Sequence, residues 1–345
     1  MFDFEGTLGA NLIAFAVAAA VVWYAGARLA YLADILSDRL HLAKSLVGLL
    51  FLSLATSLPE VATTLTGAIQ QNSDLVLNNL FGGIALQTAI LAMSDFWSRS
   101  AITSYPRKAN HALEAMLVVL LLSIVLIFIH LGERVEIAGV GLGALAVAVV
   151  YAGAIVLLRR YDDASDWVPV DLPDPDPLPF PAPTGLSNES TARLGFHVLV
   201  ACGLILVFGL ALVVLAERIA VQSGLGTSFV GVTLLAGATS LPELTTSLTA
   251  VRIGAYTMAI SNIFGSNLIM VVLVFPADLL FRKGPILNDA STTVTLSLVF
   301  GILVTTIYLI GLIVRRKPKI GRVGLDSVLV LVCFACSLWA YYLAR

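Results

Sequence analysis

The amino-acid sequence predicts an all-α polytopic membrane protein with ten transmembrane helices, arranged as two inverted five-helix repeats. The prediction rests on an apolar composition, on ten long hydrophobic stretches and on a duplicated motif. Of the 345 residues, 59% are hydrophobic and only 12% are charged, and the mean hydropathy is +0.95. Because a soluble domain of this size usually carries about 25% charged residues, most of this chain is expected to lie within a membrane.

Ten apolar stretches are long enough to cross the hydrocarbon core as helices, which takes about 20 residues. In chain order they cover residues 9–33, 45–69, 75–96, 111–130, 136–158, 195–217, 228–251, 256–281, 291–314 and 324–343. The seventh and eighth stretches are separated by only a few residues, so they could also form one merged or broken span. Cys333 and Cys336 form a C-x-x-C pair inside the last stretch and are expected to be small packing residues, since no second ligand pair accompanies them.

A polar, proline-rich segment divides the ten stretches into two sets of five. Residues 163–187 contain the run DLPDPDPLPFPAP, and prolines at this density favour an extended, solvated chain that cannot span a membrane. We therefore expect a first half over residues 1–160, a linker over residues 161–193 and a second half over residues 194–345.

The distribution of lysine and arginine predicts the orientation. With the N-terminus outside, the inner loops carry fourteen basic residues and the outer segments carry five. This bias favours outer N- and C-termini and a cytoplasmic linker. No targeting segment is recognised, which fits an integral protein of the cell (plasma or inner) membrane. The expected partners are membrane lipid and inorganic cations rather than nucleic acid, and the sequence makes no prediction of oligomeric state.

An internal repeat is the most informative feature of the sequence. Shifting the chain by 183 residues lays Ser45–Thr66 over Ser228–Thr249 without a gap, and thirteen of the twenty-two positions are identical, including the run ATSLPE. The same shift lays NLFGG at Asn79–Gly83 over NIFGS at Asn262–Ser266. Because each half has an odd number of spans, the second half is expected to enter the membrane from the opposite side, as in many secondary transporters.

Glu60 and Glu243 occupy equivalent positions of this repeat, each within an apolar stretch. An acidic side chain at the centre of a membrane helix costs about 2.5–3.5 kcal/mol on insertion scales, so such a residue usually marks an ion or proton path. The alternative is a buried, protonated glutamate that hydrogen-bonds a neighbouring helix. Each glutamate follows a proline, Pro59 or Pro242, which removes a backbone hydrogen bond and frees carbonyls upstream.

The expected result is a set of hard oxygen ligands that carries two negative charges. The freed carbonyls are expected near 53–55 and 236–238, and the adjacent hydroxyls belong to Thr56, Ser57, Thr239 and Ser240. Calcium takes six to eight oxygens from carboxylates, carbonyls and water. Two glutamates would neutralise one divalent ion, and the remaining oxygens could complete its shell or hold sodium. Soft transition metals are disfavoured because no histidine or cysteine joins the set.

Other polar residues have more than one interpretation. The four histidines, His41, His111, His130 and His197, lie near the ends of the apolar stretches and are expected at the membrane interface. Asn79 and Asn262 could serve helix packing or orient the ligands. Gly82, Gly83 and Gly265 are expected to allow close helix approach around the site.

At these motifs the sequence resembles the sodium/calcium exchanger family of the cation/calcium exchanger superfamily. The T-S-L-P-E runs at Thr56–Glu60 and Thr239–Glu243 are similar to its two repeat signatures, and NIFGSN at Asn262–Asn267 is similar to the downstream part of the second. The resemblance implies a ten-helix exchanger with alternating access between the repeats. It also implies that Glu60 and Glu243 coordinate calcium. Further oxygens for calcium or sodium would then come from the side chains of Thr56, Ser57, Thr239, Ser240 and Ser266 and from the carbonyls of Ser53 and Ala236.

Three positions depart from the family pattern. Gly83 stands in the first repeat where Ser266 stands in the second, so one sodium-ligating hydroxyl is lost. Four residues later, where the family usually carries Asn or Asp, this chain has Gln87 and Met270. Gln87 still offers a carbonyl oxygen, whereas the thioether of Met270 is a poor ligand for calcium or sodium.

The sequence therefore predicts a secondary antiporter, not an enzyme, which needs no cofactor and moves Ca²⁺ against Na⁺ at a site shared by Glu60 and Glu243. Proton coupling is the main alternative, because desolvated glutamates could take up protons as calcium leaves. A channel, an intramembrane enzyme and a non-transporting member of the family remain as further alternatives. The enzyme is disfavoured because paired glutamates alone supply neither a nucleophile with its base nor a histidine-bound metal.

Overall fold

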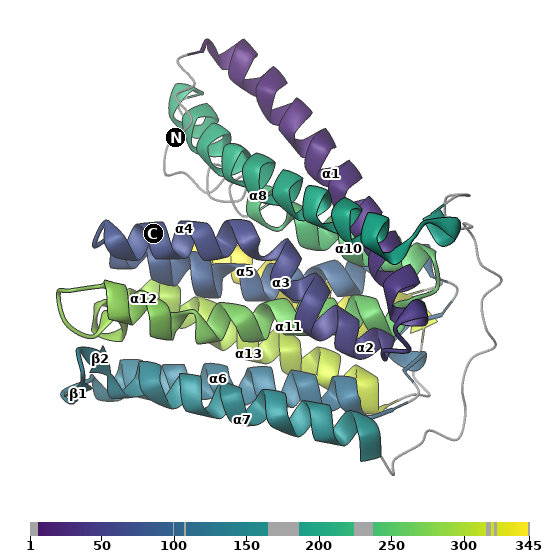
Figure 1. Cartoon of the computed structure of the whole chain (residues 1–345). Helices are drawn as coiled ribbons and strands as arrows, with labels where there is room; N and C mark the ends of the chain where they lie inside the picture. The colour runs from purple at the N-terminus through teal and green to yellow at the C-terminus, as the bar shows by residue number, and fades with distance from the viewer. Residues whose placement is uncertain are drawn as a thin grey trace.

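The computed structural model is a bundle of long helices that run roughly along one common axis (Figure 1). It describes residues 6–98, 100–106, 108–164, 186–223, 237–314, 319–320 and 323–343. In the first half the helices are α1 (Leu8–Arg39), α2 (Lys44–Leu46), a π-helical segment η1 (Val47–Leu52), α3 (Ser53–Thr56), α4 (Leu58–Ile69), α5 (Ser73–Ser94), α6 (Asn110–Leu131) and α7 (Leu142–Ala164). In the second half they are α8 (Thr191–Gln222), α10 (Leu241–Arg252), α11 (Tyr256–Val272), α12 (Val274–Leu280), α13 (Thr292–Ile313) and α14 (Leu325–Leu343).

Short elements connect these helices. Single turns of 3₁₀-helix occur at η2 (Asp95–Trp97), η3 (Ile102–Ser104), η4 (Leu186–Asn188) and η5 (Ile286–Asp289). Two antiparallel hairpins precede α7 and α14: β1 (Glu136–Ile137) pairs with β2 (Val140–Gly141), and β3 (Lys319–Ile320) pairs with β4 (Val323–Gly324). The fifth predicted span, 136–158, is therefore wrong at its start. The turn residues Ala138 and Gly139 both have positive φ, as a tight two-residue hairpin turn requires.

Within the described residues, eight helices are long and apolar enough to cross a membrane, or nine if the bent pair α2–α4 is counted as one span. Nine of the predicted stretches thus coincide with spanning helices or with this bent pair. The stretch 228–251 falls partly on residues 224–236, which lie outside the described part of the chain, so the count of ten stays a prediction. Most of the predicted linker, residues 165–185, also lies outside it.

Two helices lie at the centre of the bundle. Over the apolar stretch that identifies each span, 67% of the residues are buried in α5 and 72% in α11–α12. The corresponding shares are 22% in α1 and 28% in α7. The central helices pack against each other, against the π-helical segment η1 and against α6 and α13. Residues on α5 and α11 are therefore shielded from lipid on most sides, which makes this the place where polar side chains can be kept.

Helices α1 and α8 form a separate pair that crosses the bundle obliquely (Figure 1). They pack along each other, and they reach the rest of the protein mainly through α10 and α4. Each has 32 residues, or about 48 Å at 1.5 Å per residue. Because the hydrocarbon core is only about 30 Å thick, helices of this length have to tilt or to project from the membrane.

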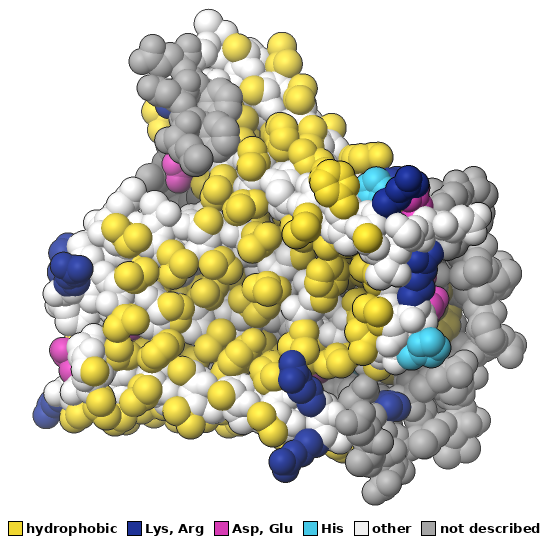
Figure 2. All heavy atoms as spheres, in the orientation of Figure 1, with side chains coloured by type: hydrophobic (Ala, Val, Ile, Leu, Met, Phe, Trp, Pro, Cys, Tyr) yellow, Lys and Arg dark blue, Asp and Glu magenta, His cyan; other side chains and the backbone are white. Residues whose placement is uncertain are grey.

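The surface supports the membrane assignment. Figure 2 shows hydrophobic side chains covering the middle of the visible face, while Lys, Arg, Asp, Glu and His side chains gather towards its two ends. A broad apolar band of this kind is expected of a protein surrounded by lipid rather than by water. The chain is thus an integral membrane protein.

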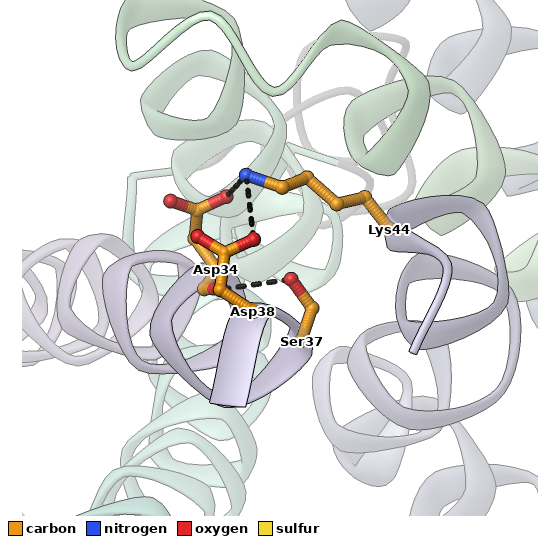
Figure 3. A network of polar contacts seen from close by, with 4 residues as sticks. All are labelled: Asp34, Ser37, Asp38 and Lys44. Carbon is orange, nitrogen blue, oxygen red and sulfur yellow. Dashed lines mark hydrogen bonds and ion pairs between the residues drawn. The ribbon is translucent and has the colours of Figure 1, made fainter. Parts of the chain in front are cut away.

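A small polar network holds the joint between α1 and α2 (Figure 3). Lys44, the first residue of α2, lies 2.5 Å from Asp34 Oδ1 and 3.5 Å from Asp38 Oδ1, both near the end of α1. The Ser37 hydroxyl donates to the Asp34 carbonyl at 2.7 Å. The two carboxylates are four residues apart, so they share one helix face. They thereby fix the start of the helix that leads to Glu60.

Candidate functional site

The two glutamate motifs have the same local backbone. Helices α3 and α4 meet at Ser57 with a bend of 52° between the two helical segments. Ser57 has φ −83° and ψ 7°, and its repeat equivalent Ser240 has φ −84° and ψ 5°. In both copies proline follows within the first turn of the new helix, where its missing N–H is tolerated. The repeat seen in the sequence is thus also a repeat of conformation.

This geometry places each glutamate in the first turn of a helix, Glu60 in α4 and Glu243 in α10. Glu60 is 2% exposed and Glu243 is fully buried. The two carboxyl groups are close enough to interact electrostatically. Backbone N–H groups at a helix N-terminus favour negative charge, so two such ends facing one site help to keep two acids in an apolar surrounding.

Both carboxyl groups retain oxygens that no described residue satisfies. In the described part of the chain, neither oxygen of Glu60 has a hydrogen-bond partner, and Glu243 Oε2 has none. Four further buried oxygens without a partner lie on the central helices, and they belong to Gln87, Asn262, Ser266 and Asn267. A buried polar atom without a partner is expensive. Unsatisfied buried oxygens on two carboxylates and on the central helices therefore indicate a site built for a ligand, and hard oxygens suit calcium or sodium.

The hydroxyl groups of the first motif reach across to the second. Ser57 donates to Glu243 Oε1 at 3.3 Å. The Thr56 side chain lies close enough to Glu243 to interact with it, while its hydroxyl donates to the Ser53 carbonyl at 3.2 Å. The structure thus places the Thr56 and Ser57 side chains of the first half beside Glu243 of the second half.

The remaining predicted ligands differ in what the structure says of them. Ser53 is buried, but its carbonyl accepts from Ser57 N at 3.0 Å as well as from Thr56, so it is not freed as expected. The proline interrupts the hydrogen bond four residues upstream of itself, which is at Ala55 rather than Ser53. Ser240 is buried and Thr239 is half-buried. Ala236 lies outside the described residues.

The two asparagines orient the motif helices. Asn79 Nδ2 donates to Thr64 Oγ1 at 2.9 Å and to the Glu60 carbonyl at 3.3 Å. The equivalent Asn262 donates to Ser247 Oγ at 3.2 Å and to a second hydroxyl, that of Thr246, at 3.1 Å. Both asparagines thus hold two helices together, which is a packing role. Asn262 has in addition a buried Oδ1 that no described residue hydrogen-bonds, so this side chain could also face a ligand.

Glycines bring η1 against α11 beside the site. A Cβ added to Gly265 would lie 2.4 Å from the Leu49 carbonyl oxygen and 2.7 Å from Ser53 Oγ, and one added to Gly48 would lie 2.5 Å from the Met258 carbonyl oxygen. The expected close approach is confirmed at Gly265. At Gly82 and Gly83 an added Cβ meets no described residue within 4 Å, so the same role is not seen there.

Two features were missed or misplaced by the sequence. Asn267 is fully buried with neither amide atom partnered, and only its place in the run NIFGSN singled it out. His111 was expected at the membrane interface, but it is 3% exposed. Its Nδ1 lies 3.1 Å from Glu114 Oε2 and 3.0 Å from Ser261 Oγ, which donates to Glu114 Oε1 at 2.7 Å. The expectation is wrong because the start of α6 packs against α11 and supplies these partners.

A family model for the sodium/calcium exchanger protein matches residues 10–158 and 194–343, which is most of both halves. The chain belongs to the sodium/calcium exchanger family. The match leaves a gap at the proline-rich segment and places one matched section on either side of it. The protein is thus a membrane cation exchanger by family, and the family comprises transporters rather than enzymes.

Curated relatives and solved structures agree with this membership. The inner membrane protein YrbG of Escherichia coli strain K12 is 26% identical over 321 residues, covering 88% of this chain and 88% of YrbG. CaxA of Alkalimonas amylolytica, a proposed antiporter, is 25% identical over 319 residues and covers 91% and 92% of the two chains.

The fold is that of the sodium–calcium exchanger NCX_Mj. Its structure soaked with 2.5 mM Na⁺ and 10 mM Sr²⁺ matches with a TM-score of 0.70 at 17% identity, over 97% of this chain and 99% of that one. Its structure soaked with zero Na⁺ and Ca²⁺ gives a TM-score of 0.68 at 17% identity, over 95% and 98%. At this identity the likeness establishes the fold alone.

Proposed function

We propose that this exchanger moves Ca²⁺ against Na⁺ and that Glu60 and Glu243 bind both ions in turn. The observation that carries the proposal is the set of buried, unpartnered carboxylate oxygens contributed by both halves of the chain. Two negative charges match one divalent ion or two monovalent ions. The same oxygens would bind either calcium or its counter-ion, so the two ions exclude each other from the site. This competition is the physical basis of exchange.

Neutral oxygens complete the proposed site. Thr56, Ser57 and Ser240 supply hydroxyls beside the glutamates, and Thr239 and the carbonyls of Ser53 and Ala236 complete the set proposed on the family resemblance. Ser266 and Gln87 contribute oxygens from the central helices, and Asn267 adds an amide oxygen that the sequence did not predict. Rotation of Thr56 about χ1 would remove one of the two hydrogen bonds to the Ser53 carbonyl and leave one of its lone pairs for an ion, while the bond from Ser57 N remains.

We further propose that the halves, residues 1–160 and 194–345, are inverted copies that expose the site alternately to the two sides. The loop at Gln71 bonds Leu280 and Arg282 near the start of α5. The equivalent loop near Arg252 lies at the other end of α5, where the Arg252 guanidinium stands 5.9 Å over the Trp97 ring. Equivalent loops at opposite ends of one helix support an inverted arrangement.

Close contacts at two equivalent glycines also support the inversion. Gly26 on α1 and Gly209 on α8 are 183 residues apart, as are the two motifs. A Cβ added to Gly209 would lie 2.5 Å from Pro59 Cγ, in the first motif, and one added to Gly26 would lie 3.5 Å from the Pro242 carbonyl oxygen, in the second. Each half thus sends its first helix across the motif of the other half. The site would thereby be bounded on one side by the pair α1–α8.

Proton coupling is the second candidate, and the departures at Gly83 and Met270 favour it. Gly83 brings no hydroxyl to the place equivalent to Ser266, and Met270 is a buried thioether, 1% exposed, in the place equivalent to Gln87. A site with fewer oxygens holds sodium less well. Protons need no such shell, because each carboxylate binds one alone.

Flux into sealed proteoliposomes containing the purified full-length protein tests the proposal. Uptake of labelled Ca²⁺ is expected when a Na⁺ gradient is imposed at fixed pH. Uptake that follows only an imposed pH gradient would replace sodium coupling by proton coupling. If neither gradient moves Ca²⁺, and labelled Ca²⁺ does not bind either, the chain is a family member without this transport activity.

Two variants assign the activity to the site. Glu60→Gln and Glu243→Gln should each abolish Ca²⁺ flux, since each removes one of the two charges. Glu217→Gln is the matched control, because Glu217 is an exposed acid of the same type on α8. Flux retained in both site variants would contradict the proposed role of the glutamates, and flux lost in the control would point to a general effect of the substitution.

A further inference from the structure

A second pair of buried acids lies far from the proposed ion site, at the end of the bundle where α6 gives way to the hairpin β1–β2. Glu133 follows α6 and is 7% exposed, and Asp278 on α12 is 1% exposed. Glu133 Oε1 accepts from the N–H of Gly143, at the start of α7. Asp278 accepts from Gly141 N and from Ile286 N, each at 2.6 Å. The pair thereby fastens a hairpin of the first half to a helix of the second.

Gly141 lies between the two carboxyl groups. Its N–H donates to Asp278 Oδ2 at 2.6 Å, and a Cβ built on it would lie 2.5 Å from Glu133 Oε2. Glu133 therefore fills the space that a side chain of residue 141 would need. Glu133 Oε2 is buried and has no hydrogen-bond partner among the described residues. One carboxylate oxygen of the pair is thus buried and unsatisfied beside Gly141, the residue whose N–H the second carboxylate accepts.

No positive side chain balances these two acids. In the described part of the chain, neither Glu133 nor Asp278 forms an ion pair with Lys, Arg or His. Each hydrogen-bond partner of these two carboxylates in the described residues is a backbone N–H, and these residues hold no group of three or more His, Cys, Asp or Glu side chains that could bind a metal ion. The component that fits is a proton, because a proton bound to one of two interacting acids removes one of the two negative charges.

Other charged groups at this end of the bundle do not neutralise the two acids. Along the hairpin strand, Glu136 interacts unfavourably with both acids. The remaining titratable groups at this end are His130 at the end of α6, Arg134 beside Glu133, Arg282 and Lys283 after α12, Asp289 in η5 and Asp74 at the start of α5. Burial first, and then the charge of Asp278, raise the pKa of Glu133 above its ordinary value of 4.5.

The same arrangement recurs at the other end of the bundle. Asp95 is the repeat equivalent of Asp278, and it accepts from Gly324 N, the equivalent of Gly141 N, at 3.2 Å. A Cβ built on Gly324 would lie 2.3 Å from Asp326 Oδ1. The second acid comes from a different position of the repeat, since Asp326 is equivalent to Gly143 and not to Glu133.

An unpartnered donor supports a ligand at this second pair. Tyr308 is fully buried, its hydroxyl has no hydrogen-bond partner among the described residues, and it interacts electrostatically with both Asp95 and Asp326. A single aspartate would be enough to hold each hairpin. The addition of a second acid at both ends, from different positions, calls for a function of the pair itself.

We propose that Glu133 and Asp278 form a proton-binding site, and that Asp95 and Asp326 form its counterpart at the other end. The bound proton holds the hairpin β1–β2 and the start of α7 against α12. Loss of the proton leaves two buried negative charges side by side, and the hairpin then opens more readily. The contribution to stability is present below the ordinary glutamate pKa and is lost as the pH rises through the raised pKa of the folded protein.

Hydrogen exchange of the full-length protein in lipid nanodiscs tests this site, because the Gly141 and Gly143 amides are the donors that the pair holds. After correction for intrinsic chemistry, the protection of residues 136–144 should fall with rising pH in the wild-type protein. The fall should approach about tenfold per pH unit between ~pH 4.5 and the raised pKa. Glu133→Gln should remove this pH dependence, since a glutamine amide is neutral and can donate to Asp278 at every pH.

The matched control is Glu136→Gln, which removes an exposed acid of the same hairpin and should keep the wild-type pH dependence. Protection that does not vary with pH in the wild-type protein, or that varies equally in Glu133→Gln, would overturn the proposal. If Glu133→Gln fails to fold, infrared spectroscopy supplies the second measurement. The protonated-carboxyl band that titrates in a Glu60→Gln/Glu243→Gln background should lose intensity in Asp278→Asn, and the part that remains should belong to Asp95 and Asp326. A band of unchanged intensity and pH dependence would equally exclude the site, and this background separates the outcome from the proposed ion site.

Discussion

Replacing Glu60 with glutamine should change the protein in two opposite ways. Without ions, Glu60 and Glu243 are two buried acids whose charges repel each other, and no partner satisfies either oxygen of Glu60 in the described part of the chain. Glutamine removes one charge at nearly constant volume, so the ion-free variant should unfold at the same temperature as the wild-type protein or at a higher one. With calcium present the order should reverse, because only the wild-type site binds the ion.

The size of the reversal follows from the charge that is lost. Two unit charges about 4 Å apart attract by about 4 kcal/mol at an effective dielectric constant of about 20. The double charge of calcium increases this attraction, so losing one carboxylate weakens binding by about a thousandfold or more. Calcium at about 100 times the wild-type Kd stabilises the folded protein by about 2.7 kcal/mol. The variant, at about a tenth of its own Kd, gains less than about 0.1 kcal/mol. For a protein of 345 residues, whose unfolding entropy is about 2.1 cal/mol/K per residue, the difference is about 4 °C in Tm.

The assay is thermal unfolding of the purified full-length protein in detergent, with and without Ca²⁺, for wild type, Glu60→Gln and Glu243→Gln. Glu217→Gln, an exposed acid on α8, serves as control and should keep the calcium-induced rise in Tm. A rise of wild-type size in either site variant would refute the reasoning. So would an ion-free Tm several degrees below that of the wild-type protein, since it would show that the glutamate has a structural role.

Three further outcomes are expected. Gly83→Ser introduces the hydroxyl that the second half carries at Ser266, and no described residue lies within 4 Å of the new Cβ. Sodium-driven Ca²⁺ flux should therefore rise relative to pH-driven flux, and an unchanged ratio would contradict the loss of a sodium-binding hydroxyl at position 83. Gly265→Ala places a Cβ 2.4 Å from a backbone oxygen of η1 and should cost about 1–3 kcal/mol of folding free energy, measured as a lower Tm. Gly153→Ala, with open space around it, should not lower the Tm, and equal effects of the two substitutions would contradict the packing argument. Asp34→Asn breaks the closer ion pair with Lys44, whose side chain is 36% exposed. The loss of folding free energy should therefore be only about 0.2–1 kcal/mol and should shrink in high salt, and a larger, salt-independent loss would contradict a surface role.

The sequence predicted the helices well where one apolar stretch forms one helix. The span expected at 75–96 is observed as α5, Ser73–Ser94, and the span expected at 111–130 is observed as α6, Asn110–Leu131. Apolar stretches of membrane length can hardly form anything but helices, because no water satisfies the backbone there. The hairpin at 136–141 was missed because its Ile, Ala and Val residues run without a break into the apolar helix that follows.

The sequence was less informative about contacts between distant residues. Nothing local to Glu133 or Asp278 indicates that they meet, since 145 positions separate them and the contact depends on how the halves dock. His111 was misplaced for the same reason, because its partner Ser261 lies on another helix of the second half. The repeat identified Glu60 and Glu243 from sequence alone, since an acid after a proline twice in apolar surroundings has few structural explanations.

The most direct test of the account is to locate the ion. Crystals of the full-length protein grown with Sr²⁺, a heavier stand-in for Ca²⁺, would reveal the ion through its anomalous scattering. We expect one dominant peak between the carboxylates of Glu60 and Glu243, within about 2.3–2.6 Å of oxygens from both. A dominant peak elsewhere, or carboxylates too far apart to bind a common ion, would contradict the claim that the two halves share one site.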